Sequence, residues 1–285
     1  MNDLEDCIKK GNELFETKQF FEFISFCKKI TDGDIPDLKK AAVWYKISMA
    51  YYSLGRYYNS VSSINKALSL NPNNPGYWIH KGDVLQSEKC SRFDEAIESY
   101  KTAMRLQPKN PGPLIKLGSL YDSRNNHQEA IESYNKALEL NPDNPEIWYH
   151  KGCSLNSILY KKEKERRKLN LINDISHEIH FLDEILNTFK KVQELDPKNS
   201  DALYSIGVLY TKMMKDLDAL QYFDEALKYY SKENEKPTQI WYSKAELLDK
   251  VGKNDEALEF YEKYEAELKK DLEEFNKKRR SGYRT

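Results

Sequence analysis

Two histidines and a nearby carboxylate are the first candidates for chemistry: the run His177-Glu178-Ile179-His180, with Glu184 one helical turn later. Zinc metalloproteases carry HExxH on a helix, because histidines at i and i+4 both face one ion. In this chain the histidines stand at i and i+3, so that motif is absent. The run is either a surface site of two histidines and one carboxylate or a solvated helix face. We expect the solvated face, and no metal.

Basic residues gather in the run 161–168, KKEKERRK, and in the tail from Lys277, KKRR. Such clusters contact phosphates in nucleic-acid-binding proteins, with an affinity that falls as salt rises. A solvated helix and a helix that docks a partner protein have the same composition. The whole chain carries 45 Lys and Arg against 46 Asp and Glu, which leaves no general attraction for polyanions. We therefore do not expect nucleic acid as the partner, and we keep RNA or another polyanion as the alternative.

Motifs of enzyme active sites are missing from the sequence. It contains no GxSxG, P-loop or GxGxxG pattern and no grouping of serine, histidine and acid. The four cysteines are far apart, and none belongs to a CxxC pair, which argues against a zinc knuckle or a redox centre: Cys7, Cys27, Cys90 and Cys153. We predict a protein that is not an enzyme and uses no cofactor.

Composition and length favour helices in a water-soluble chain. The 285 residues include only 11 glycines and 10 prolines, fewer than loop-rich β folds use, and 12% of the residues are aromatic. The acidic start has no apolar segment of a secretory signal, and no apolar run of 18 residues follows. We expect a cytoplasmic location and no contact with a membrane.

An internal repeat organises the sequence. Three segments are near copies of one another: LSLNPNNPGYWIHKG (68–82), MRLQPKNPGPLIKLG (104–118) and LELNPDNPEIWYHKG (138–152). Pro72, Pro108 and Pro142 are 36 and 34 residues apart, so the period is near 34. Duplication also explains why His80 and His150 stand in the equivalent peptides YWIHKG and IWYHKG better than paired catalysis does.

One copy shows the internal pattern most completely, in Leu114, Leu117, Gly118, Tyr121, Ala130, Tyr134, Ala137 and Pro142. The first four fall on one face of a helix. The order and spacing resemble the tetratricopeptide repeat, W-x2-L-G-x2-Y, then A-x3-F, then P. The resemblance implies an all-α, right-handed superhelical solenoid of helix-turn-helix repeats, in which small residues let two helices approach and proline ends the second helix.

Seven copies of this frame, with occasional insertions, cover nearly the whole chain as one domain, residues 1–285. Their ranges are about 4–40, 41–74, 75–110, 111–144, 145–199, 200–237 and 238–271. The copy at 145–199 holds an insertion of about 21 residues, which we interpret as a helical hairpin near 160–180. The charged stretch 265–280, with Leu268, Leu272 and Phe275 on one stripe, is predicted to be a capping helix.

The resemblance implies that one stripe of each first helix lines a concave groove that binds a peptide or a partner helix. The fifth place of the frame is apolar or aromatic in every copy, starting with Ile8, and would form a ladder along the groove. The predicted partner-binding residues are Tyr45, Met49, Tyr52, Ile79, Asp83, Ile115, Tyr149, Asn156, Tyr204, Val208 and Tyr242. Alternatively these side chains pack sideways between adjacent repeats.

Some tetratricopeptide proteins hold the carboxylate tails of chaperones with inner asparagine and lysine residues. Asn12 is the only clear inner asparagine in the first repeat, and the following repeats offer Lys46, Met49 and His80 in place of the required set. We therefore expect a scaffold or adaptor that binds another protein, without assuming chaperone tails. The identity of the partner and the oligomeric state stay open.

Overall fold

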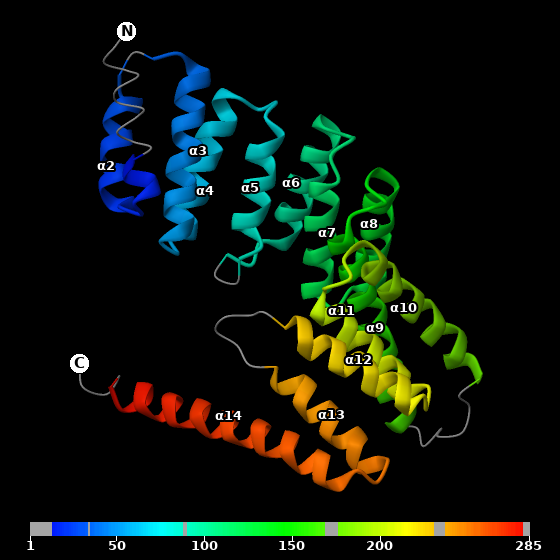
Figure 1. Ribbon diagram of the computed structural model, residues 1–285. Coiled ribbons are helices and arrows are strands. Elements are labelled where there is room, and N and C mark those ends of the chain that lie inside the picture. Colours follow the sequence, from blue (N-terminus) through cyan, green and yellow to red (C-terminus); the bar gives the residue numbers. More distant parts are fainter. Residues whose placement is uncertain (1–12, 34, 88–89, 169–175, 231–236, 282–285) are drawn as a thin grey trace. The chain divides into compact units, whose positions relative to one another are not determined.

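The computed structural model describes residues 13–33, 35–87, 90–168, 176–230 and 237–281, without the side chains of residues 176–178, 278, 280 and 281. Within these ranges the regular structure consists of α-helices, and they contain no strand (Figure 1). The chain divides into two compact units, residues 1–142 and 143–285. The prediction of a single domain over residues 1–285 stays a prediction.

Unit 1 consists of helices that pack in consecutive pairs. They are α2 (Phe20–Thr31), α3 (Asp37–Ser53), α4 (Tyr57–Leu70), α5 (Pro75–Leu85), α6 (Phe93–Leu106), α7 (Gly112–Ser123) and α8 (His127–Leu140). The main contacts join α3 to α4, α5 to α6, and α7 to α8. Most of the expected first helix of the copy at 4–40, including Ile8 and Asn12, lies outside the described residues.

Unit 2 repeats this arrangement, and three of its helices, α9, α10 and α14, are longer than those of unit 1. Its helices are α9 (Pro145–Lys168), α10 (Ser176–Leu195), α11 (Ser200–Lys212), α12 (Asp216–Tyr229), α13 (Thr238–Lys250) and α14 (Asn254–Ser281). Each odd-numbered helix packs mainly against the even-numbered helix that follows it. The prediction of an all-α array of paired helices is thus confirmed for the part of the chain that the structure describes.

The pairs form because the second helices bury a stripe of small and larger apolar residues against the first helices. In α6 the buried residues Ala96, Ser99, Tyr100 and Ala103 recur at i, i+3, i+4 and i+7, which is one face of a helix. A Cβ atom at Gly82 of α5 would lie 2.5 Å from Cε1 of Tyr100. Any larger residue at this place would force the tyrosine ring or the helix to shift.

Asparagine and proline residues end one pair and begin the next. Helix α4 ends at Leu70, directly before Asn71 and Pro72, and α5 begins at Pro75. The side chain of Asn74 accepts a hydrogen bond from the backbone N–H of Gly76, which caps the start of α5. Proline suits the first helical turn because that turn needs no N–H donor from it.

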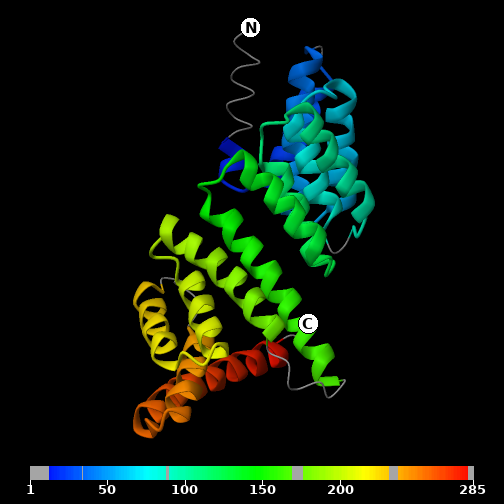
Figure 2. The ribbon, with the colours of Figure 1, turned by 90° about the vertical axis from the view of Figure 1, so that its right-hand side faces the viewer.

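The insertion lengthens both helices of one pair. Helix α9 has 24 residues and α10 has 20, whereas α11 and α12 have 13 and 14. The two long helices lie side by side (Figure 2). The ammonium of Lys162 lies 4.6 Å from the ring centroid of Phe181 in α10, and Glu163 accepts a hydrogen bond of 2.6 Å from Lys212 in α11. Residues 169–175, the middle of the predicted hairpin, lie outside the described residues.

Helix α14 runs without a break over 28 residues. The predicted capping helix at 265–280 is therefore the continuation of the second helix of the last pair. The apolar stripe of this segment faces solvent, since Leu268, Leu272 and Phe275 are exposed. Over the described residues, every helix is too short or too polar to cross a membrane.

Candidate functional site

The predicted partner-binding residues lie on the first helices of the pairs, α3, α5 and α7 in unit 1 and α9, α11 and α13 in unit 2. Two of them are exposed, Tyr52 at 38% and Tyr242 at 39%. The others are half-buried: Tyr45, Met49, Ile79, Asp83, Ile115, Tyr149, Asn156, Tyr204 and Val208. None of the eleven is buried, so the first helices of each unit keep part of these side chains accessible to a ligand.

In unit 1, two predicted tyrosines of α3 gather around a histidine of α5. Tyr45 stacks on Tyr77 with ring centroids 4.9 Å apart. Its ring centroid lies 5.3 Å from that of His80, in a T-shaped arrangement. The ring centroid of Tyr52 lies 5.9 Å from that of the same histidine and 5.5 Å from that of Tyr57. Tyr45 thus packs sideways onto the next repeat, as one of the two interpretations expects, while Tyr52 stays exposed.

Beneath these rings lies a buried polar network. The hydroxyl of Ser48 donates to the backbone oxygen of Ser60 at 2.8 Å and lies 3.0 Å from Nε2 of His80. The hydroxyl of Ser60 in turn donates to the backbone oxygen of Ser48 at 2.8 Å. Burial lowers the pKa of His80 to about 4, against the opposing effects of Asp83 and Ser48. His80 is therefore neutral near pH 7.

The carboxylate of Asp83 connects two successive pairs, α5–α6 and α7–α8. Its Oδ1 accepts a hydrogen bond of 2.8 Å from the buried hydroxyl of Tyr100 in α6. The ammonium of Lys116 in α7 lies 3.2 Å from the same oxygen, and the amide of Gln86 lies at 3.4 Å. Tyr100 needs this acceptor because a buried hydroxyl without a partner is costly. Lys116 is a looser contact, with 47% of its side chain exposed.

The charge of Asp83 acts on the tyrosines around it. Burial raises the pKa of Tyr45 and of Tyr52, and in both the carboxylate of Asp83 is the second cause. The same two causes, in the same order, raise the pKa of Tyr100. Phenols near a carboxylate resist losing their proton because like charges repel. The cluster thus holds one anionic group among neutral aromatic rings.

In unit 2 the predicted tyrosines contact residues of neighbouring helices. Tyr149 meets Phe189 with ring centroids 6.0 Å apart, and burial raises its pKa. The hydroxyl oxygen of Tyr204 lies 3.1 Å from that of Ser243 in α13, a sideways contact between adjacent repeats. Tyr242 lies 5.1 Å from Tyr264 of α14.

The sequence predicted Tyr45, Tyr52 and Asp83 but missed His80, Tyr100 and Lys116. One signal in the sequence points to the missed network. Where other copies carry glycine and alanine at the helix contact, the copy at 41–74 carries Ser48 and Ser60. Two buried hydroxyls require polar partners, and a neighbouring histidine is a fitting one.

The other candidates for chemistry are less organised. His180 and Glu184 are exposed, the side chain of His177 lies outside the described residues, and no group of three metal-ligating side chains occurs among the residues described. Burial raises the pKa of Cys27 to about 12, so its thiol stays protonated near pH 7.

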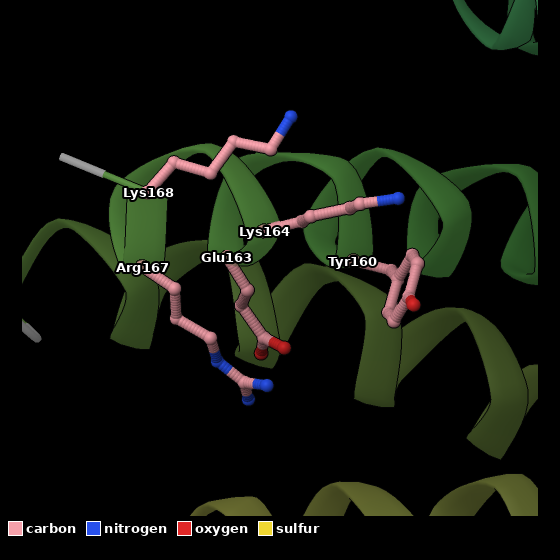
Figure 3. A pocket seen from close by; sticks show the side chains of 5 residues that line it. All are labelled: Tyr160, Glu163, Lys164, Arg167 and Lys168. Carbon is pink, nitrogen blue, oxygen red and sulfur yellow. The ribbon is translucent and has the colours of Figure 1, made fainter.

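The basic end of α9 lines a shallow hollow of about 380 Å³. Its lining residues are Tyr160, Glu163, Lys164, Arg167 and Lys168. The side chains of Arg167 and Lys168 point to opposite sides of the helix (Figure 3). The cations of Arg167 and Lys168 thus point apart, and Glu163 is already paired with Lys212. The hollow therefore does not concentrate positive charge at one point.

Comparison with known families assigns the chain. Models of the tetratricopeptide repeat match residues 41–74, 75–110, 201–232 and 217–271, and a model named TPR repeat matches 121–154. The chain is a tetratricopeptide repeat protein. Its first two matches cover the helices that carry Ser48, His80 and Asp83. Tetratricopeptide repeats generally mediate protein–protein interactions, and the family is typically non-catalytic.

Solved structures agree on the fold. The C-terminal part of a TPR repeat-containing protein from Cytophaga hutchinsonii is 15% identical, with a TM-score of 0.68 over 90% of this chain and 94% of that one. A tetratricopeptide repeat protein from Parabacteroides merdae is 15% identical, with 0.62 over 93% of both chains. Pseudomonas aeruginosa pilF is 16% identical, with 0.58 over 77% of this chain and 88% of that one. No curated protein matches the sequence.

Proposed function

We propose that this tetratricopeptide repeat protein is a non-enzymatic scaffold or adaptor, and that the face of α3, α5 and α7 binds a peptide segment or helix of a partner protein. The cluster of Tyr45, Tyr52 and Asp83 supports the proposal most directly. It combines exposed aromatic area with a charged group, on consecutive first helices of unit 1. Tyrosine suits such a surface, because it adds contact area and a hydroxyl at low conformational cost.

The packing beneath the face favours a rigid binding surface. Asp83 is held by Tyr100, and Tyr45 is held by Tyr77 and His80. A surface that is ordered before binding loses less conformational entropy when a ligand arrives. Tyr52 lies at the outer edge of this ordered cluster, so it is the residue whose removal disturbs binding most and folding least.

Peptide display on the full chain tests the proposal. We expect a library of random dodecapeptides to yield binders, and Tyr52→Ala to weaken their affinity about tenfold, because tyrosines that a ligand covers carry much of the energy of an interface. Isothermal titration calorimetry of the selected peptides measures the change. The matched control is Tyr58→Ala, since Tyr58 lies on the second helix α4 of the same pair and is 71% exposed.

We expect Tyr58→Ala to leave the affinity unchanged. A library without binders, or binders that lose as much affinity with Tyr58→Ala as with Tyr52→Ala, would overturn the assignment of the binding face. Thermal unfolding of both variants verifies that neither substitution has unfolded the protein.

A further inference from the structure

The chemistry around Asp83 indicates which side chain a partner presents to unit 1. Asp83 is the ninth residue of α5, and 23% of its side chain is exposed. Residues from α3 and α7 flank it, with Tyr45 and Tyr52 close enough to respond to its charge and Lys116 in contact. An acidic group accessible from outside and lined by apolar rings favours a cation as its ligand.

Lys116 already shows that the carboxylate accepts an ammonium group. Its Nζ lies 3.2 Å from Oδ1 of Asp83, on a side chain that is 47% exposed. An ion pair with so exposed a member contributes little to stability, because water screens the charge and ordering the long side chain costs entropy. A cation from a partner can therefore displace Lys116 at small cost, while the hydroxyl of Tyr100 continues to donate to Oδ1 of Asp83.

The rings around the carboxylate add a second attraction. The faces of aromatic rings attract ammonium and guanidinium groups, more strongly where water is excluded. Tyr45 and Tyr52 keep their protons, and His80 is neutral near pH 7, so no positive charge from the ring cluster opposes an incoming cation. Lys116 is the competing cation in direct contact with Asp83.

We propose that the face of α3, α5 and α7 selects partner segments that carry a lysine or arginine, whose cation displaces Lys116 at the carboxylate of Asp83 beside Tyr45 and Tyr52. The proposal rests on the function proposed above and adds the chemistry of the ligand. It also assigns Lys116 a role. This internal cation must leave Asp83 before a partner's cation binds, which weakens binding. Neutral or acidic segments bring no cation to replace it, so they gain no affinity at Asp83.

A positional library of acetylated, amidated decapeptides tests the selection. One position at a time is fixed as Lys, Arg, norleucine or Glu, and capture by the full chain is measured for each. We expect a preference of about tenfold for Lys or Arg over norleucine at one position, with Glu the least favoured. Asp83→Asn should abolish the preference, because the amide keeps an acceptor for Tyr100 but carries no charge. Asp94→Asn, on the exposed face of α6, is the matched control and should keep it.

Lys116→Met gives the sharpest result, since it removes the internal competitor. We expect it to strengthen capture of the Lys and Arg sublibraries several-fold and to leave the norleucine sublibrary unchanged. Peptides that bind and depend on Tyr52 but tolerate Asp83→Asn would overturn the cation proposal and leave the proposed function standing. Preference for Glu would overturn it as well. A failure of all sublibraries to bind would instead count against the proposed function.

Discussion

His80 and His150 occupy the same place in two almost identical peptides, YWIHKG in α5 and IWYHKG in α9, yet their surroundings differ. His80 is 9% exposed, and its Nε2 lies 3.0 Å from the hydroxyl of Ser48. The side chain of His150 is 37% exposed, and its Nε2 lies 3.7 Å from a carboxylate oxygen of Glu146, on its own helix. Two hexapeptides that agree in Trp, His, Lys and Gly thus carry a buried neutral histidine in unit 1 and a surface histidine in unit 2.

A neighbouring pair of residues shows what does stay the same. The ammonium of Lys81 lies 5.2 Å from the ring centroid of Trp78, and that of Lys151 lies 5.3 Å from Trp148. Burial lowers the pKa of both lysines. These contacts form within one helix, so the hexapeptide itself determines them.

The contacts of His80 come from the preceding repeat instead. Ser48, Tyr45 and Tyr52 all belong to α3. In a tetratricopeptide array, therefore, local sequence sets the contacts inside a repeat, and the preceding repeat sets the environment of the face that a partner meets. Copies with similar sequences need not form equal sites.

Removing each histidine side chain should show the largest difference between the two sites. We expect His80→Ala to lower the free energy of unfolding by about 2–4 kcal/mol, because it leaves a cavity against Tyr45 and Tyr52. His150→Ala should lower it by less than about 1 kcal/mol, since solvent already reaches that ring. Urea unfolding at pH 7, followed by tryptophan fluorescence, measures both. Equal losses would show that the two environments are alike in solution.

The burial of His80 should also make the stability of the protein depend on pH. In the unfolded chain the pKa of a histidine is near 6.5, whereas that of folded His80 is about 4. Above pH 6.5 the imidazole of His80 is neutral in both the folded and the unfolded state. Between pH 6.5 and pH 4 it binds a proton in the unfolded state but not in the folded state. Stability should therefore fall as the pH drops, by about 2 kcal/mol between pH 7 and pH 5.

His80→Phe isolates this contribution, because it keeps a ring against the two tyrosines and removes the proton site. The difference in unfolding free energy between pH 7 and pH 5 should shrink by about 2 kcal/mol in this variant. If His80→Phe showed the same pH dependence as the unaltered protein, the depressed pKa of His80 would be wrong.

Much of the fold follows from local sequence, and the candidate face follows only in part. Gly82 and Tyr100 belong to one repeat, so their spacing alone predicts that the two helices pack there. Tyr52 and Asp83 were predicted because their places in the frame point away from that packing. Their connection through His80 and Lys116 depends on how successive repeats are offset, which a period of about 34 residues does not specify.

The end of the chain illustrates the same limit. Residues 254–281 contain no proline or glycine, so nothing in them stops a helix, and α14 is continuous. The repeat frame nevertheless predicts an end near 271, where earlier copies turn. The absence of helix-breaking residues is a local signal, whereas the repeat frame is a pattern over the whole chain. Here the local signal determined the length of the helix.

A double-mutant cycle sharpens the comparison at its finest level, the single contact between Ser48 and His80. We expect Ser48→Ala and His80→Phe to be coupled by about 1 kcal/mol in unfolding free energy, the net value of one buried hydrogen bond. Glu146→Gln with His150→Phe should show a coupling near zero, because an exposed pair gains little from its charges. The hydroxyl of Ser60 keeps its own acceptor in Ser48→Ala, so the cycle reports on the histidine contact alone. A coupling near zero in both cycles would mean that the rings of Tyr45 and Tyr52, and not the hydroxyl of Ser48, hold His80 in place.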